Sequence, residues 1–176
     1  MKNAIPASAL GLFALGLAGC VPSPSAMSPA AAASPGTCRA AQLALSLDSR
    51  DGWFDGMSHS GTMLVLRNTG KTACTLPSQP APTLRDAAHR PLPIVALAPD
   101  GAQPPPVKLA PGASVESGMR WVSGDVYEHG HCLSPAFVTL AVGAETVSAA
   151  FTGHLCGPGD TPVDYTLTPF QPPSQP

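Results

Sequence analysis

The sequence has few charged residues. Only 11% of its 176 residues are Asp, Glu, Lys or Arg, and the formal net charge is −2. A nucleic-acid-binding surface needs a basic patch and a disordered acidic tail needs a block of carboxylates, so the composition predicts neither. Beyond the N-terminus, no apolar run approaches the roughly 18 to 20 residues that cross a bilayer as a helix.

Helix breakers, by contrast, are abundant. The 22 prolines and 17 glycines make up more than a fifth of the chain. This content excludes a helical bundle and favours an all-β body with proline-rich flanks. With a short N-terminal segment removed, the length predicts one domain.

The N-terminus has the pattern of a secretory signal. Met1-Lys2-Asn3 is followed by an apolar core over residues 9–17 and then by small residues. Leu17-Ala18-Gly19-Cys20 resembles the lipobox of bacterial lipoproteins, in which cleavage before the cysteine leaves it as the lipidated N-terminus. We therefore expect a signal peptide over residues 1–19 and lipidation of Cys20. The alternative is an ordinary signal followed by a chance cysteine.

This resemblance implies a membrane partner and a location. A lipoprotein cysteine carries two or three acyl chains such as palmitate, and at about 0.8 kcal/mol per buried methylene several chains hold firmly. Val21 stands where an Asp retains lipoproteins at the inner membrane, so an outer-membrane location, on its periplasmic or surface face, is expected. Residues 20–37, rich in Pro, Ala and Ser, form the predicted tether, and residues 171–176 a disordered tail.

Between these flanks the pattern is that of short strands. Leu43, Leu45 and Leu47 alternate with Ala and Ser in a half-buried strand over residues 42–47. Residues 62–76 form an apolar run broken at Asn68-Thr69-Gly70, which predicts a buried central strand that ends in a tight turn. Further strands are expected at residues 83–85, 92–97, 114–122, 137–142, 146–151 and 165–168. Pro93 assigns residues 92–97 to a sheet edge.

These elements predict an immunoglobulin-like antiparallel β-sandwich of about seven to eight short strands. Ala110-Pro111-Gly112 is a type II turn signal, and Gly143-Ala144-Glu145 separates the strands of a hairpin. Residues 48–61 form a loop between the first two strands.

Four cysteines remain once Cys20 is set aside: Cys38, Cys74, Cys132 and Cys156. In an oxidising compartment they form two disulfides, and composition leaves three connectivities open. Strand register favours one of them. A hairpin centred near Ala144 places residue 132 opposite residue 156, and pairing Leu45 with Leu66 or Arg67 places residue 38 opposite residue 74. A thiolate metal site is the alternative, but no Cys-x-x-Cys spacing supports it.

Several of these features together resemble one family. They are Cys38, the Asn68-Thr69-Gly70 turn with Cys74-Thr75-Leu76, Pro80 or Pro82, Leu109-Ala110-Pro111-Gly112, Trp121 and the late cysteine pair. Their order is similar to that of the DUF4232 family, domains of unknown function in secreted and lipid-anchored bacterial proteins. The resemblance covers residues 38–170 and implies a sandwich. It implies no activity.

Two patterns in the long loop approach catalytic or calcium motifs without meeting them. Gly56-Met57-Ser58-His59-Ser60 lacks the last glycine of a nucleophile elbow, and no strand leads into it. Asp48, Asp51 and Asp55 are spaced like calcium ligands, but Arg50 stands where a ligand oxygen is needed. We predict no catalytic residue, no cofactor and no metal site here.

Two sets of residues leave alternatives open. Met57, His59 and Met63, with His129 and His131, offer thioether and imidazole ligands suited to copper. The competing interpretation places Met63 in the core and the histidines on loops. Trp53 and Phe54 form either an exposed binding tip or a cover over the end of the sandwich.

The leading hypothesis is a lipid-anchored, non-enzymatic binding or envelope-structural module with an unidentified envelope protein or glycan partner. A periplasmic copper-binding protein is the alternative.

Overall fold

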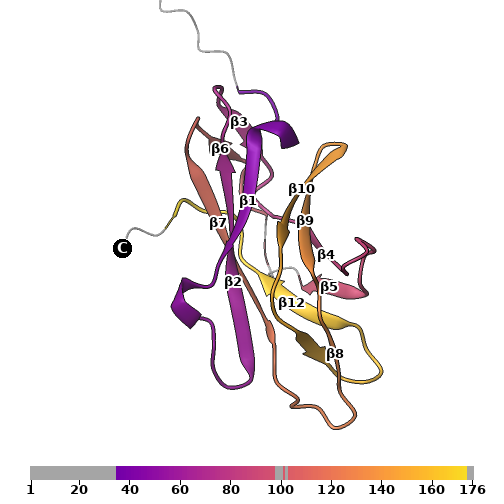
Figure 1. Ribbon diagram of the computed structural model, residues 1–176. Coiled ribbons are helices and arrows are strands. Elements are labelled where there is room, and N and C mark those ends of the chain that lie inside the picture. The colour runs from indigo at the N-terminus through magenta and orange to yellow at the C-terminus, as the bar shows by residue number, and fades with distance from the viewer. Residues whose placement is uncertain (1–34, 98–100, 102, 174–176) are drawn as a thin grey trace, which may run out of the picture. The chain divides into compact units, whose positions relative to one another are not determined.

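The computed structural model describes residues 35–97, 101 and 103–173, which belong to one compact unit beginning at Ser34. In the described part the chain forms strands and two single-turn 3-10 helices (Figure 1). The elements are η1 (Ala40–Gln42), β1 (Leu43–Asp48), η2 (Arg50–Gly52), β2 (His59–Asn68), β3 (Cys74–Leu76), β4 (Pro82–Arg85), β5 (Ile94–Leu97), β6 (Val107–Leu109), β7 (Ser114–Val122), β8 (His131–Leu133), β9 (Phe137–Val142), β10 (Glu145–Ala150), β11 (Leu155–Gly157) and β12 (Val163–Leu167). None of the described helices is long and apolar enough to cross a membrane.

Two sheets enclose the core. The larger has the order β1-β2-β7-β12-β5 and the smaller β10-β9-β4, while β11–β8 and β3–β6 form two-stranded ribbons. Buried side chains from both sheets pack together, with Leu64, Met119 and Tyr165 of the larger sheet against Leu84 and Val138 of the smaller. The structure therefore confirms the all-β sandwich.

Tyr165 also ties the two layers by a hydrogen bond. Its side chain is 1% exposed, and its hydroxyl donates to the carbonyl oxygen of Pro82 at 2.7 Å. Burial raises the pKa of this phenol to about 12, since the charged form would be desolvated. The hydroxyl therefore keeps its proton, and its hydrogen bond, throughout the physiological range.

The strand β2 holds the larger sheet together. It pairs with β1 on one side, where Leu45 faces Leu66, and with β7 on the other, where Leu64 faces Ser117. Its inward-facing Leu64 and Leu66 are at most 1% exposed. It begins at His59, earlier than the expected residue 62, because Ser60 and Gly61 still pair with β7.

The topology differs from the expectation in three respects. Twelve strands are present in the described residues instead of seven or eight, because β3, β6, β8 and β11 have three residues each, too few to give a periodic signal. The last strand, expected at residues 165–168, is Val163–Leu167 and lies inside the sheet between β7 and β5. The pair β5–β12 is parallel, because no hairpin joins these distant segments to impose the antiparallel direction.

The ends of the body also extend further than expected. Thr37 forms a parallel bridge with Thr75, and the carbonyl oxygen of Gly36 accepts a hydrogen bond from the Thr75 amide. At the other end, Gln171 exchanges two backbone hydrogen bonds with Glu116. These residues, assigned to the tether and tail, belong to the fold. The predicted signal peptide, Cys20 and most of the predicted tether lie outside the described residues.

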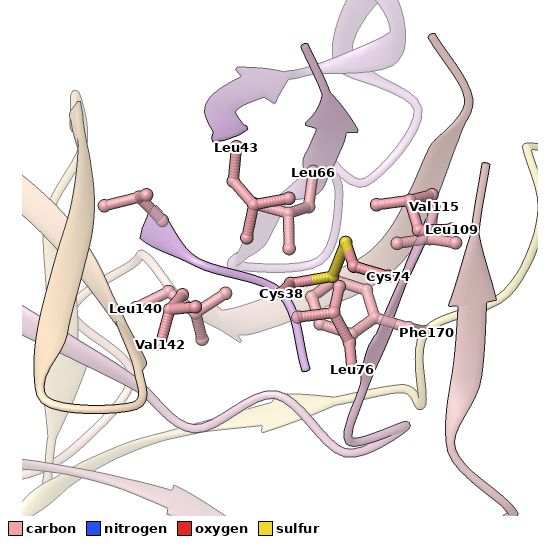
Figure 2. Packing of buried hydrophobic residues seen from close by; sticks show 11 residues of the cluster. Cys38, Leu43, Leu66, Cys74, Leu76, Leu109, Val115, Leu140, Val142 and Phe170 are labelled. Atoms are coloured by element: carbon pink, nitrogen blue, oxygen red, sulfur yellow. A yellow bond between two sulfur atoms is a disulfide. The ribbon is translucent and has the colours of Figure 1, made fainter. Parts of the chain in front are cut away.

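Both disulfides join the cysteines that the register argument paired. Cys38–Cys74 is buried and packs against Phe170, Leu76 and Leu109 in one of the two core clusters (Figure 2). Cys132–Cys156 joins residues directly opposite each other in the β8–β11 ribbon.

The details of that argument need correction. Cys38 does not extend the β1–β2 hairpin, because its amide donates to the carbonyl oxygen of Thr75 on β3. The β9–β10 hairpin pairs Val142 with Glu145, so its turn has two residues rather than three. The β8–β11 ladder is therefore offset by one residue from the hairpin beside it.

Asn68, the last residue of β2, is a fully buried polar residue whose hydrogen bonds hold the end of the strand. Its side-chain amide donates to the carbonyl oxygens of Thr72 at 2.9 Å and Leu109 at 3.1 Å, and its side-chain oxygen accepts from the Gly70 amide at 2.9 Å. Its backbone binds Gly112 and Ala113, in the turn before β7. A single side chain thus joins the β2–β3 turn to β6, because an amide supplies both donors and an acceptor.

Replacing Asn68 with Asp should lower the free energy of unfolding by at least about 3 kcal/mol. The change removes both donors, leaves two carbonyl oxygens unpaired and buries a charge. Urea denaturation followed by circular dichroism measures the effect. Lys71→Ala, an exposed change in the same turn, is the control and should stay within about 0.5 kcal/mol of the parent. Equal urea midpoints for Asn68→Asp and Lys71→Ala would contradict the stabilising role of the Asn68 side chain.

Candidate functional site

The loop between β1 and β2, residues 49–58, folds back over the outer face of the larger sheet. An ion pair fixes its beginning: the guanidinium of Arg50 binds the carboxylate of Glu116 on β7 and lies 3.2 Å from Oδ2 of Asp48. Glu116 is only 4% exposed. Removing one partner of a buried pair leaves an uncompensated charge, which costs about 3 to 5 kcal/mol. The pair therefore holds the loop against the sheet.

The middle of the loop is fixed by Phe54. Its ring covers Gly61 on β2 and lies near Gly118 on β7, next to the buried Met63. A Cβ atom at Gly61 would come within 2.8 Å of Phe54 and 2.5 Å of the Met119 carbonyl oxygen. The ring fits against the strands because glycine leaves this space free.

Hydrogen bonds fix the rest of the loop. Ser60 donates to Oδ1 of Asp55 at 2.5 Å, and the Ser58 carbonyl oxygen accepts from the amides of Ser123 and Gly124. Several non-glycine residues have left-handed backbone conformations, namely Arg50, Asp51, Met57 and Ser58, with φ between 48° and 64°. Such conformations cost energy and persist where the surrounding structure imposes them, as at many binding sites.

This rigid loop exposes two large apolar side chains. Trp53 is 75% exposed and Met57 is 96% exposed, while Phe54 between them faces the sheet. Trp53 is therefore exposed, whereas Phe54 covers the outer face of the larger sheet and not the end of the sandwich. Binding through Trp53 stays a prediction.

The residues considered as copper ligands lie in different settings. Met63 belongs to the buried residues, as the competing interpretation expected. His59 lines a hollow of about 230 Å³ with Asp55 and His154, while His131 lies on β8 and His129 before it. His129 has a φ of 64°, so the His-x-His segment is not extended.

Within the described ranges, no three His, Cys, Asp or Glu side chains gather around a position for one metal ion. Copper binding through Met57, His59, His129 and His131 therefore stays a prediction from the sequence.

The loop carboxylates have structural partners. Asp48 pairs with Arg50 and Asp55 with Ser60, which accounts for two of the three acidic residues spaced like calcium ligands. The Arg50–Glu116 pair was not predicted. Its members are 66 residues apart, and the sequence contains no signal that would join them.

Another hollow of about 550 Å³ lies beside β3. It is lined by Thr37, Leu76 and Pro77 with the proline run of residues 104–106, and Ser78 holds that run by donating to the Pro104 carbonyl oxygen at 2.6 Å. The lining of this hollow consists mainly of proline ring carbons with few polar groups, and it includes no set of acidic, basic or nucleophilic side chains that could act together as a catalytic site.

The fold and its bridges define a disulfide-bonded, all-β domain of the kind that forms in oxidising, extracytoplasmic compartments. Its sequence over residues 38–171 matches the family model described as "Domain of unknown function (DUF4232)". Because the match covers more than half of the chain, the protein belongs to the DUF4232 family. Searches of curated proteins and of solved structures gave no match.

Changing Gly61 to Ala should destabilise the protein by about 2 to 4 kcal/mol, because the new methyl group meets a backbone oxygen as well as the Phe54 ring. The loop should also become sensitive to protease at residues 49–58. Gly36→Ala is the matched control, since no atom lies within 4 Å of the position a Cβ would take there. Thermal unfolding and limited proteolysis measure the two effects. A Gly61→Ala variant that melts like Gly36→Ala would refute the packing described.

Proposed function

We propose that the protein is a lipid-anchored, extracytoplasmic binding module without catalytic activity. Its binding element is the β1–β2 loop, and Trp53 and Met57 are the residues that contact an envelope protein or glycan. One observation carries this proposal: among the described residues, the most exposed large apolar side chains stand on a loop fixed by the buried ion pair and by Phe54.

The physical argument concerns the cost of ordering a binding loop. A flexible loop loses conformational entropy when it binds, whereas one already held in shape loses little. Tryptophan is also enriched among the residues that dominate interface energies. A fixed loop with an exposed Trp53 therefore combines low ordering cost with a large contact surface.

The loop and the predicted tether join opposite ends of β1, which fits a body attached to the membrane through the tether. Thr37, the last residue of the predicted tether, pairs beside β3, and the chain then runs along β1 to the loop. Six strand residues span about 20 Å. A tether entering at Thr37 leaves Trp53 at the far end of β1, accessible to a partner.

A photoreactive amino acid at position 53 of the full chain, irradiated in native membranes, tests the binding element. We expect a specific cross-linked product at position 53 and none at position 44, which is exposed on β1. Trp53→Ala should leave the melting temperature unchanged, because its side chain is largely in solvent. Absence of a product specific to position 53 would reject this binding element.

Cys20→Ser tests the anchor separately. We expect the variant to be recovered in the soluble fraction without acyl chains, while the parent fractionates with membranes. Fractionation and intact-mass measurement give both readouts. Membrane fractionation of an unacylated variant would contradict lipid anchoring and leave the loop proposal to be judged by the cross-linking.

A further inference from the structure

The two larger sheets have four edge strands in the described residues, and one differs in composition. The strands β1, β10 and β4 each contain a charged residue, namely Asp48, Glu145 and Arg85. The strand β5 reads Ile-Val-Ala-Leu and has none. Charged residues are one of the features that keep edge strands from pairing with other chains, and β5 lacks the charge that the other three carry.

The side chains of β5 also differ from those of an ordinary edge. Val95 and Leu97 are 44% and 45% exposed, and they stand two residues apart on one strand. In the pairing with β12 they face Asp164 and Thr166, so they lie on the outer side of the sheet, away from the buried Val163 and Tyr165. Among the described residues, the other exposed large apolar side chains are in loops.

Among the described residues, the backbone of β5 pairs in a ladder on one side. Figure 1 shows β5 beside β12, at the end of the five-stranded order. Within the described part of the chain, β5 forms a ladder with β12 and with no other strand. The groups on its other side therefore form a template for one more strand.

We propose that β5 pairs antiparallel with β5 of a second copy of this chain, which joins the two larger sheets into one continuous sheet. The uncharged strand favours a second copy, because an antiparallel copy brings no like charges together. Each copy also covers its partner's exposed apolar side chains with its own. This association does not involve the Trp53 loop.

The alternation of strand side chains limits the register. Residues directly opposite in a ladder point to the same face, so outward Val95 can face outward Leu97 of the copy but not inward Ala96. Pairing Val95 with Val95 across a two-fold axis also meets this condition but sets Leu97 opposite Pro93, so we propose the register that pairs Ala96 with Ala96. It makes two identical contacts between Val95 and Leu97, one on each side of the axis.

The interface is small, since β5 has four residues. Stable interfaces bury about 1,200 to 2,000 Å², so a weak dimer with a micromolar or higher dissociation constant is expected in solution. Anchoring both copies in one membrane would raise their effective concentration.

Sedimentation equilibrium of the full chain in mild detergent, at increasing protein concentrations, tests the proposal. Val95→Lys and Leu97→Glu should each weaken dimerisation at least about 10-fold, since each places a charge against an apolar side chain. The double variant Val95→Lys/Leu97→Glu should return to within about 3-fold of the parent, because the register sets the two new charges opposite each other. Ala44→Lys, an exposed change on β1, is the control and should have no effect.

A photoreactive amino acid at position 97, used in membranes with two differently tagged copies, identifies the occupant. A cross-link between the two tags supports the second copy, and a cross-link exclusively to another protein overturns it. A chain that stays monomeric at every concentration also overturns the proposal. Single variants that dimerise like the parent, or a double variant no stronger than the singles, reject the β5 register. Unchanged melting temperatures of the variants exclude unfolding as the cause.

Discussion

The antiparallel ladder between β2 and β7 is the interaction on which the rest of the structure depends. It runs from the pair His59–Val122 to the pair Arg67–Ser114. Its inner side supplies Leu64, Leu66 and Met119 to the two core clusters, and its outer side supplies the glycines that receive Phe54. Glu116, which holds Arg50, is also on this ladder. The core and the candidate binding loop are thus built on opposite faces of the same two strands.

This arrangement explains how a domain with so few charges can present a rigid loop. The loop has no helix longer than the single turn η2 and no long ladder of its own, and several of its residues are in costly backbone conformations. Its shape comes from the outer face of the sheet, through one buried ion pair and one aromatic ring. The exposed residues Trp53 and Met57 can therefore be positioned without contributing to the core.

Local patterns in the sequence were sufficient to predict much of the sheet. The strand over residues 114–122 was predicted with the bounds that the structure shows. The Asn68 turn and the Pro111-Gly112 turn also carry strong local signals, and the latter closes with a hydrogen bond from the Ala113 amide to Ala110. A strand or turn whose pattern lies in neighbouring residues of the sequence is thus found in the structure where it was predicted.

The remaining features come from contacts between distant segments, which no periodicity encodes. The parallel β5–β12 pair depends on how the chain crosses between layers, and the Arg50–Glu116 pair joins a loop to a strand far along the chain. Phe54 and Trp53 are adjacent aromatic residues with opposite environments, and only the presence of Gly61 and Gly118 beneath the loop distinguishes them. These are the features that define the candidate site, so the sequence predicted the scaffold better than the site.

Native-state hydrogen exchange of backbone amides tests the central role of the β2–β7 ladder most directly. The account predicts that the paired amides of β2 and β7 exchange slowest of all, with a free energy equal to that of global unfolding. Amides of the loop, residues 49–58, should exchange through smaller openings that leave the ladder intact. If the β2 and β7 amides exchanged through local opening while those of the β9–β10 hairpin stayed protected, the ladder would not be the element on which the fold depends.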